Sequence, residues 1–221
     1  MLIGDGKTEA IARIIMGKAT PGFRRILVIG CGSGLEAAIL AQEMLVDVVG
    51  IDLQSNFDPR AVSRADLRKG DATCLDFEDQ SFDIVYSYHA LEHIPDYRLA
   101  LAEMRRVLTD IGTYCIGTPN RLRLLGYIGS KNATLWQKIQ WNITDWYARI
   151  RGKFRNEFGA HAGFSSSELH TELARVFTEV EEITLPYYIE VYRDHERVIQ
   201  LINRSSLGRF LFPSIYFMGK K

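Results

Sequence analysis

Three alternating glycines close a short apolar run, and an acid follows at a spacing that suits a nucleotide ribose. The apolar run 26–29 leads into the three glycines, which are Gly30, Gly32 and Gly34, and residues 35–42 carry small and aliphatic side chains at helical spacing. A strand that turns through glycines into a helix lets backbone approach a ligand closely and presents the unpaired N–H groups of the helix start. Asp52 ends a second apolar run roughly 20 residues later, where an acid accepts hydrogen bonds from a ribose diol. The pattern therefore predicts a site for an adenosine-type cofactor.

The spacing of the glycines narrows the choice of cofactor. A dinucleotide-binding turn has glycine at its first, third and sixth positions, and Leu35 stands at the sixth position here. A nicotinamide-dependent oxidoreductase is therefore disfavoured.

Further motifs follow in a fixed order along the chain. They are Gly70-Asp-Ala72, Leu75–Ser87, His89-Ala-Leu-Glu-His-Ile-Pro-Asp96, Glu103–Leu108, Thr113–Arg121 and His161-Ala-Gly-Phe-Ser-Ser-Ser-Glu-Leu169. In order and spacing, these motifs and the glycine turn resemble the type 11 branch of the class I S-adenosylmethionine-dependent methyltransferases. That branch includes the ubiquinone and menaquinone biosynthesis methyltransferases. The resemblance is strong over residues 22–121 and looser over 159–185.

The resemblance implies S-adenosyl-L-methionine as cofactor, with its methionine end on the glycine turn. The residues expected there are Gly30, Cys31, Gly32 and Gly34. Val28 departs from the family pattern, because many members have an acid two residues before the first glycine. The methionine amino group then needs another partner, and we expect a backbone carbonyl near Tyr88.

The resemblance assigns the nucleoside end to two acids and their neighbours. Asp52, followed by Leu53, is expected to hold the ribose hydroxyls, and the Asp71 carboxylate to accept from the adenine amine while the Ala72 N–H approaches the ring. The alternative for Asp71 is a turn-forming role, since aspartate side chains often bond to the backbone two residues on.

Two histidines are candidates for the base. Methyl transfer is an in-line displacement at a sulfonium carbon, so the protein must align the reactants and remove a proton if the nucleophile is a hydroxyl. His89 and His161 are the expected bases, although His161 can equally be a loop residue without a role. His89, Glu92 and His93 could instead hold a divalent ion, or Glu92 and His93 could simply pack under the cofactor; some of the ubiquinone O-methyltransferases that the chain resembles use a metal there, but carry glutamate in place of His89. We expect no metal.

The segment 121–160 is expected to be an inserted amphipathic lid. On a helical projection one face is apolar, and its members are Leu135, Trp136, Ile139, Ile143, Trp146, Tyr147 and Ile150. We expect this face to cover the acceptor pocket. The alternative is peripheral contact of residues 133–155 with an anionic membrane, since tryptophan and basic residues anchor interfacial helices.

The elements that position these residues alternate between strand and helix. Strands are predicted at 25–29, 46–51, a short run ending at 69, 82–86, 114–117, 180–185 and 214–218, and helices at 8–18, 34–44, 96–108 and 165–176. Such alternation predicts an α/β fold: a Rossmann-like, mainly parallel seven-stranded sheet with helices on both faces and an antiparallel edge strand. We expect residues 1–221 to form a single domain.

Composition limits the partners and the compartment. The chain has 221 residues, 47% hydrophobic, and a formal net charge of zero, so nothing global points to nucleic acid. Three scattered cysteines and the lack of a signal-peptide or membrane-spanning run favour a cytoplasmic protein, with a position at the membrane periphery as the alternative.

The sequence therefore predicts a methyltransferase that acts on a small-molecule, lipid or quinone, or glycan acceptor, by O-methylation. The alternatives are C- or N-methylation, which needs no strong base for an amine, and a non-catalytic subunit that only binds S-adenosylmethionine. The oligomeric state is left open.

Overall fold

The computed structural model describes residues 4–127, 133–156 and 161–221, built around one seven-stranded sheet. The strands are β1 (Arg25–Ile29), β2 (Asp47–Asp52), β3 (Asp66–Lys69), β4 (Phe82–Tyr88), β5 (Leu108–Pro119), β6 (Glu181–Glu182) and β7 (Ser214–Lys220). Their order is β3-β2-β1-β4-β5-β7-β6. The first five are parallel, and at one edge of the sheet β7 runs antiparallel to both of its neighbours, β5 and β6. The predicted fold class is confirmed.

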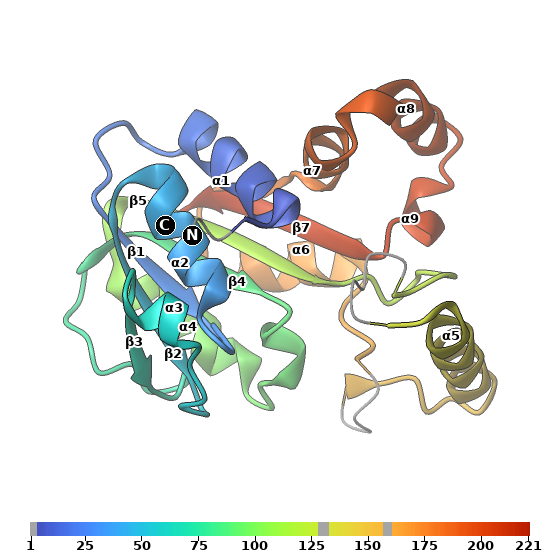
Figure 1. The fold of residues 1–221 in the computed structure, drawn as a ribbon, viewed down its shortest axis with the longest axis horizontal. Helices are drawn as coiled ribbons and strands as arrows, with labels where there is room; N and C mark the ends of the chain where they lie inside the picture. Colours follow the sequence, from blue (N-terminus) through green and yellow to red (C-terminus); the bar gives the residue numbers. More distant parts are fainter. Residues whose placement is uncertain (1–3, 128–132, 157–160) are drawn as a thin grey trace.

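Helices cover both faces of the sheet (Figure 1). They are α1 (Gly6–Lys18), α2 (Leu35–Met44), α3 (Pro59–Val62), α4 (Tyr97–Val107), α5 (Leu135–Ile150), α6 (Ser166–Ala174), α7 (Thr184–Val191), α8 (Glu196–Arg204) and α9 (Gly208–Leu211), with 3₁₀ turns η1 (Leu91–His93) and η3 (Arg193–His195). Side chains of α1, α2 and α7 share one core cluster, and those of α4 and α6 share the other. Each layer buries the apolar side chains that one strand face presents.

The parallel strands bring the expected site residues to one edge. Ile29 lies opposite Ile51 on β2 and opposite Ser87 on β4, so the chain leaves three neighbouring strands at one level. Gly30, Asp52 and His89 stand at or just beyond these ends. In open α/β sheets this carboxyl edge is where ligands bind.

The sheet edge differs from the prediction in the length of its last strands. Residues 180–185 were expected to be a strand, but β6 has only two residues and α7 begins at Thr184. The Tyr187 N–H donates to the Ile183 carbonyl, and Pro186 lies in the first helical turn, where its missing N–H costs nothing. The antiparallel partnership with β7 is confirmed, and β5 is longer than predicted because it pairs with β4 and β7 on its two sides.

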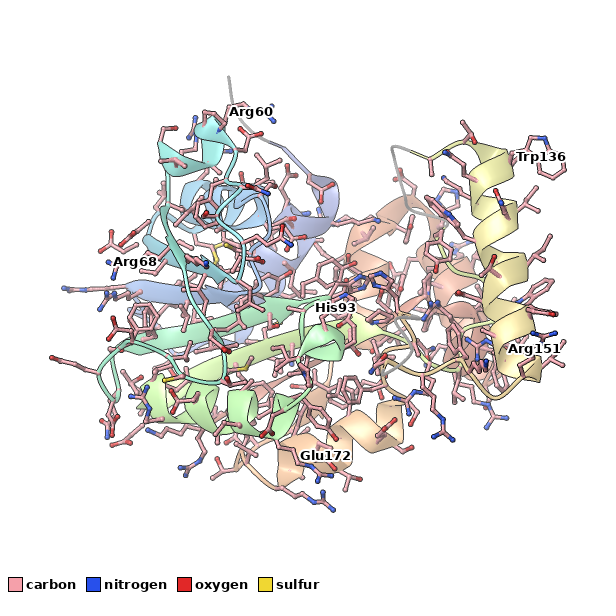
Figure 2. The ribbon with its side chains drawn as sticks, turned by 90° about the horizontal axis from the view of Figure 1, so that it is seen from below. Arg60, Arg68, His93, Trp136, Arg151 and Glu172 are labelled. Atoms are coloured by element: carbon pink, nitrogen blue, oxygen red, sulfur yellow. The ribbon has the colours of Figure 1, made fainter. Side chains whose placement is uncertain are left out.

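Helix α5 has the predicted amphipathic pattern but the opposite orientation to the one expected. None of its side chains is buried, and its apolar face is exposed to solvent. Its polar side faces the rest of the protein, and Trp136 and Arg151 project from the helix at the end of the molecule (Figure 2). The expectation that this apolar face covers the acceptor pocket is therefore wrong for the described residues. Residues 128–132 and 157–160 of the predicted lid lie outside the described residues.

No helix in the described part of the chain is both long and apolar enough to cross a membrane.

Candidate functional site

The glycine turn after β1 has a backbone geometry that allows a ligand to approach closely. Gly30 and Gly32 both have positive φ, at 68° and 53°. A Cβ on Gly30 would come within 2.2 Å of the Ala90 Cβ, so the turn packs closely against the loop after β4. A Cβ on Gly32 would meet no protein atom within 4 Å, which leaves this stretch of backbone open to a ligand.

Asp52 is held at the end of β2 by two backbone N–H groups. The Gly32 N–H donates to its Oδ2 and the Gln54 N–H to its Oδ1, each at 2.9 Å. A carboxylate has about four acceptor positions, so roughly two remain for a diol. The same contacts link the glycine turn to Asp52 and hold its carboxylate at the wall of a cavity, which is described next.

A cavity of about 550 Å³ runs along the carboxyl ends of β1, β2 and β3. Its lining includes most of the predicted nucleoside contacts and one residue of the glycine turn: Gly30, Asp52, Leu53, Asp71 and Ala72. Asp71 also makes the alternative turn contacts, because its Oδ1 accepts from the Thr73 N–H (2.8 Å) and hydroxyl (2.7 Å). These bonds lower the pKa of Asp71, so it stays an acceptor at neutral pH.

Four of the predicted cofactor residues do not line this cavity: Gly32 is exposed at the turn, and the other three lie elsewhere. The Cys31 side chain is buried beside Gly50, and burial raises the pKa of its thiol to about 12, so this residue can meet a cofactor only through its backbone. Gly34 packs against Leu67 at the start of α2. Tyr88 lines a second, larger cavity rather than the first.

The second cavity, of about 750 Å³, is predominantly apolar and aromatic. Tyrosines from three elements form much of its wall: Tyr88 of β4, Tyr187 and Tyr188 of α7, and Tyr216 of β7. The Tyr88 ring stacks on Tyr216 with 5.6 Å between ring centroids. Aliphatic side chains of α8 and α9 complete the wall, namely Ile199, Ile202 and Leu211.

His89 joins the two cavities, since it lines both. Its N–H donates to the Gly117 carbonyl (2.9 Å), and its Nε2 lies 3.0 Å from the Ser214 hydroxyl. His89 is exposed at the junction of the cavities, but desolvation by the atoms around its ring lowers its pKa to about 3, and the charge of Arg123 lowers it further. The imidazole is therefore neutral at physiological pH and can accept a proton.

The other predicted base, His161, lies in a group with Glu92 and His93. One ligand atom from each lies within 4.8 Å of the others, and the two imidazole rings meet edge to face at 4.5 Å. The Glu92 side chain is fully buried with neither oxygen hydrogen-bonded, and burial raises its pKa to about 7. The group could hold a divalent cation or, without one, a protonated carboxyl. The sequence suggested His89 as the third member of such a set, but the structure brings His161 to Glu92 and His93 instead.

The larger cavity contains residues that the sequence reasoning did not identify. The sequence predicted no element and no site residue within 186–213, yet α7, α8 and α9 form much of the cavity wall. The available signal was the pair Tyr187-Tyr188 with Val191 and Tyr192 at helical spacing, which shares one face of a helix. Arg123 and Tyr127 reach the same cavity from the predicted lid segment, and His161 reaches it from the position directly after that segment.

Comparisons with known proteins show which family the chain resembles. A family model described as a methyltransferase domain matches residues 27–116. An uncharacterized methyltransferase of Mycobacterium tuberculosis is 30% identical over 140 residues, covering 61% of this chain and 67% of that protein. A ubiquinone biosynthesis O-methyltransferase of Azorhizobium caulinodans is 33% identical over 156 residues, covering 66% of this chain and 60% of that enzyme.

A solved structure supports the fold. It is a SAM-dependent methyltransferase of Thermotoga maritima, described as a possible histamine N-methyltransferase, with a TM-score of 0.56 and 18% identity over 98% of this chain and 89% of that one. The chain spans 39% of the length of one curated relative and 60% of another, so acceptors do not transfer from relatives to this protein. The fold, the motifs and the identity shared with these relatives place the chain in a family: it belongs to the class I S-adenosylmethionine-dependent methyltransferases, in the type 11 branch.

Proposed function

We propose that this protein transfers the methyl group of S-adenosylmethionine to a hydroxyl oxygen of a small, largely apolar acceptor bound in the tyrosine-lined cavity. The observation that carries the proposal is that His89 lines both cavities, so a proton acceptor stands where cofactor and acceptor would meet. In this proposal Asp52 binds the ribose, Asp71 and Ala72 bind the adenine, and the glycine turn with Cys31 backbone and the Tyr88 region holds the methionine end.

The proposed reaction needs one proton transfer and one displacement. The acceptor oxygen attacks the methyl carbon, the bond from that carbon to the sulfonium breaks, and S-adenosylhomocysteine leaves with the sulfur electron pair. The acceptor's proton moves to the neutral imidazole of His89 as the new bond forms, or to His161 if the hydroxyl lies nearer to that ring. Alignment of oxygen, carbon and sulfur is the main contribution of the protein.

The low pKa of His89 favours an acidic hydroxyl among the possible acceptors. An imidazole with a pKa of about 3 is a weak base, and proton transfer to it is less costly from a phenol than from an alcohol. The aromatic and aliphatic wall fits a flat apolar ring better than a polar sugar. We therefore place phenols and hydroquinones, including lipid-linked ones, ahead of glycans.

A screen with isotope-labelled S-adenosylmethionine and phenol, hydroquinone, amine and glycan acceptors tests the proposal. We expect methyl transfer to a phenolic oxygen, and His89→Ala should lower kcat/KM by roughly 100-fold or more if the imidazole takes the proton. His170→Ala on the exposed side of α6 is the matched control and should leave the rate unchanged.

The pH profile of the same assay separates a base of low pKa from an ordinary histidine. Because protonation of His89 requires a pH near 3, kcat/KM should not fall as the pH decreases through 6.5. Methylation of amines alone, with no loss in His89→Ala, would favour the N-methyltransferase alternative. Cofactor binding without turnover of any acceptor would favour the non-catalytic subunit.

A further inference from the structure

Helix α5 is fixed to the protein by its polar side. The Asn142 side chain exchanges two hydrogen bonds with the backbone of Gly126, at 2.7 and 3.1 Å. Asp145 pairs with the buried Arg123 (3.1 Å), and Arg149 donates to the carbonyls of Arg121 and Arg123. Thr134 and Gln137 form a capping box that fixes where the helix begins. The rotation of the helix about its axis is therefore set by specific contacts.

This rotation exposes the apolar face. Trp136 is 78% exposed, Ile143 56% and Ile150 85%, and the remaining members of the face are also exposed: Leu135, Ile139, Trp146 and Tyr147. Soluble helices normally turn such a face toward the core. In both views α5 lies at one end of the molecule, beyond the sheet (Figures 1 and 2). Large exposed apolar patches mark interaction surfaces.

The surroundings of this face are basic in a chain of zero net charge. Residues 121–127 and 133–156 contain one acidic residue, Asp145, and seven basic residues: Arg121, Arg123, Lys138, Arg149, Arg151, Lys153 and Arg155. Arg123 and Arg149 bond to the protein on the inner side of the helix and Arg121 pairs with Glu168, so the exposed charge beside the apolar face comes from the residues after the helix. Arg151, Lys153 and Arg155 are exposed and follow directly after the helix. The Arg151 guanidinium lies over the Tyr147 ring, 4.2 Å from its centroid, so positive charge borders the aromatic surface.

From this arrangement we infer that the outer face of α5 docks on an anionic lipid bilayer. Tryptophan, tyrosine and isoleucine enter the interface between headgroups and acyl chains, and the arginines and lysine at the helix end meet anionic headgroups. A second copy of the chain fits less well, because it would bring two basic surfaces together.

The docking face continues toward the acceptor cavity. The Trp146 indole N–H donates to the Leu124 carbonyl (2.7 Å), and the Leu124 N–H donates to the Phe210 carbonyl on α9 (2.7 Å). This connecting stretch exposes three leucines, Leu122, Leu124 and Leu125, while Arg123 and Tyr127 of the same stretch line the cavity. Docking would therefore place the cavity beside the bilayer, and the acceptor would be a lipid-soluble phenol or hydroquinone. This last step rests on the proposed function.

Flotation with lipid vesicles tests the docking. We expect the protein to bind vesicles of phosphatidylcholine with phosphatidylglycerol, to bind pure phosphatidylcholine poorly, and to be released by high salt. The double variant Ile143→Glu/Ile150→Glu should bind anionic vesicles at least about tenfold more weakly, because two charges would enter the apolar interface. Leu99→Glu, an exposed apolar position on α4, is the matched control and should bind like wild type. No binding at low salt, or equal binding of the double variant, would overturn the inference.

Two further measurements separate this inference from the proposed function. In the absence of vesicles, the double variant should methylate a water-soluble phenol at the wild-type rate, since neither isoleucine lines a described cavity. With a hydroquinone embedded in anionic vesicles, its rate should fall while that of Leu99→Glu does not. If neither variant nor wild type methylates phenols, the proposed function fails, while the flotation result stands. A wild-type dimer that the double variant converts to a monomer, without vesicle binding, would instead assign the face to a second copy.

Discussion

His89 stands in a region of backbone space that residues with a side chain rarely adopt, with φ at 51°. Such a conformation costs on the order of 1 kcal/mol or more and persists only where the surroundings determine it. Here the Gly117 carbonyl holds its N–H and the Ser214 hydroxyl meets its ring. This geometry directs the imidazole to the point where the two cavities meet. The motif identified His89 as a candidate, but nothing in the type of this residue indicates its left-handed backbone conformation.

Glu92 yields a prediction about stability and pH. Burial raises its folded-state pKa from 4.5 to about 7, so between these pH values the folded state binds more protons than the unfolded state. The free energy of unfolding should therefore decrease as pH rises from about 5 to 8, and this one group should account for up to about 3 kcal/mol. Glu92→Gln removes the titration and should show a shallower decrease by urea unfolding.

The comparison between wild type and Glu92→Gln isolates this group, because Glu36, whose pKa is also raised to about 7, is common to both. Equal pH dependence in the two proteins would contradict the assignment. If Zn²⁺ or Mn²⁺ flattened the wild-type curve and had no effect on Glu92→Gln, a cation among Glu92, His93 and His161, rather than a proton, would balance the buried carboxylate.

In helix α5 we expect the polar side chains, rather than the apolar ones, to contribute most to the stability of the fold. Asp145→Ala would leave Arg123, which is 4% exposed, without its carboxylate, and should lower the free energy of unfolding by roughly 2 kcal/mol. Ile143→Ala removes an exposed side chain from the same helix and should change it by less than about 0.5 kcal/mol. Thermal or urea unfolding of the two variants measures the difference. A larger loss for Ile143→Ala would mean that the apolar face packs inward.

The elements that the sequence predicted well are those with local signals. The glycine turn after β1, the strands β1 and β2, and the capping box at Ser165 are each specified by adjacent residues. The periodicity of residues 135–150 identifies which side chains share a face, but it cannot say which face is turned inward. That choice depends on hydrogen bonds that join Asn142, Asp145 and Arg149 to residues 121–126, which are distant in sequence. The apolar stretch of α7 fits a strand or a helix, and its tertiary position decides.

The same distinction holds for the site as a whole. Asp52 and Asp71 follow directly from local motifs and line the predicted cofactor cavity. The tyrosine wall comes from β4, α7 and β7, which meet only because the antiparallel strand β7 joins the parallel sheet beside β5. No local pattern encodes that meeting, so the tyrosine-lined cavity could not be predicted from the sequence.

Because the cofactor cavity joins the ends of several strands, ligand binding should stabilise the whole sheet. Gly30, Asp52, Asp71 and His89 come from separate stretches of chain, so a bound cofactor would connect them and none of these contacts exists in the unfolded state. S-adenosylmethionine at 100 times its Kd should therefore add about 2.7 kcal/mol to the free energy of unfolding and raise the Tm. Asp52→Ala should weaken binding by roughly 100-fold, because the two proposed charge-assisted hydrogen bonds to the ribose would be lost. At the same concentration the added free energy should then fall to about 0.4 kcal/mol, and most of the Tm increase should disappear.

The controls for this prediction separate binding from folding. Asp52 also accepts two backbone N–H groups, one on each oxygen, so Asp52→Asn, which keeps one acceptor oxygen, should lose less stability than Asp52→Ala and bind with intermediate affinity. Asp66→Ala removes an exposed acid of β3 that pairs with Arg68, and should respond to S-adenosylmethionine as wild type does. Calorimetric titration gives the affinities and a thermal melt gives the Tm. Unchanged affinity in Asp52→Ala would mean that the ribose lies elsewhere. The proposed orientation of the cofactor, which places its methyl group near the acceptor oxygen beside His89, would then be wrong.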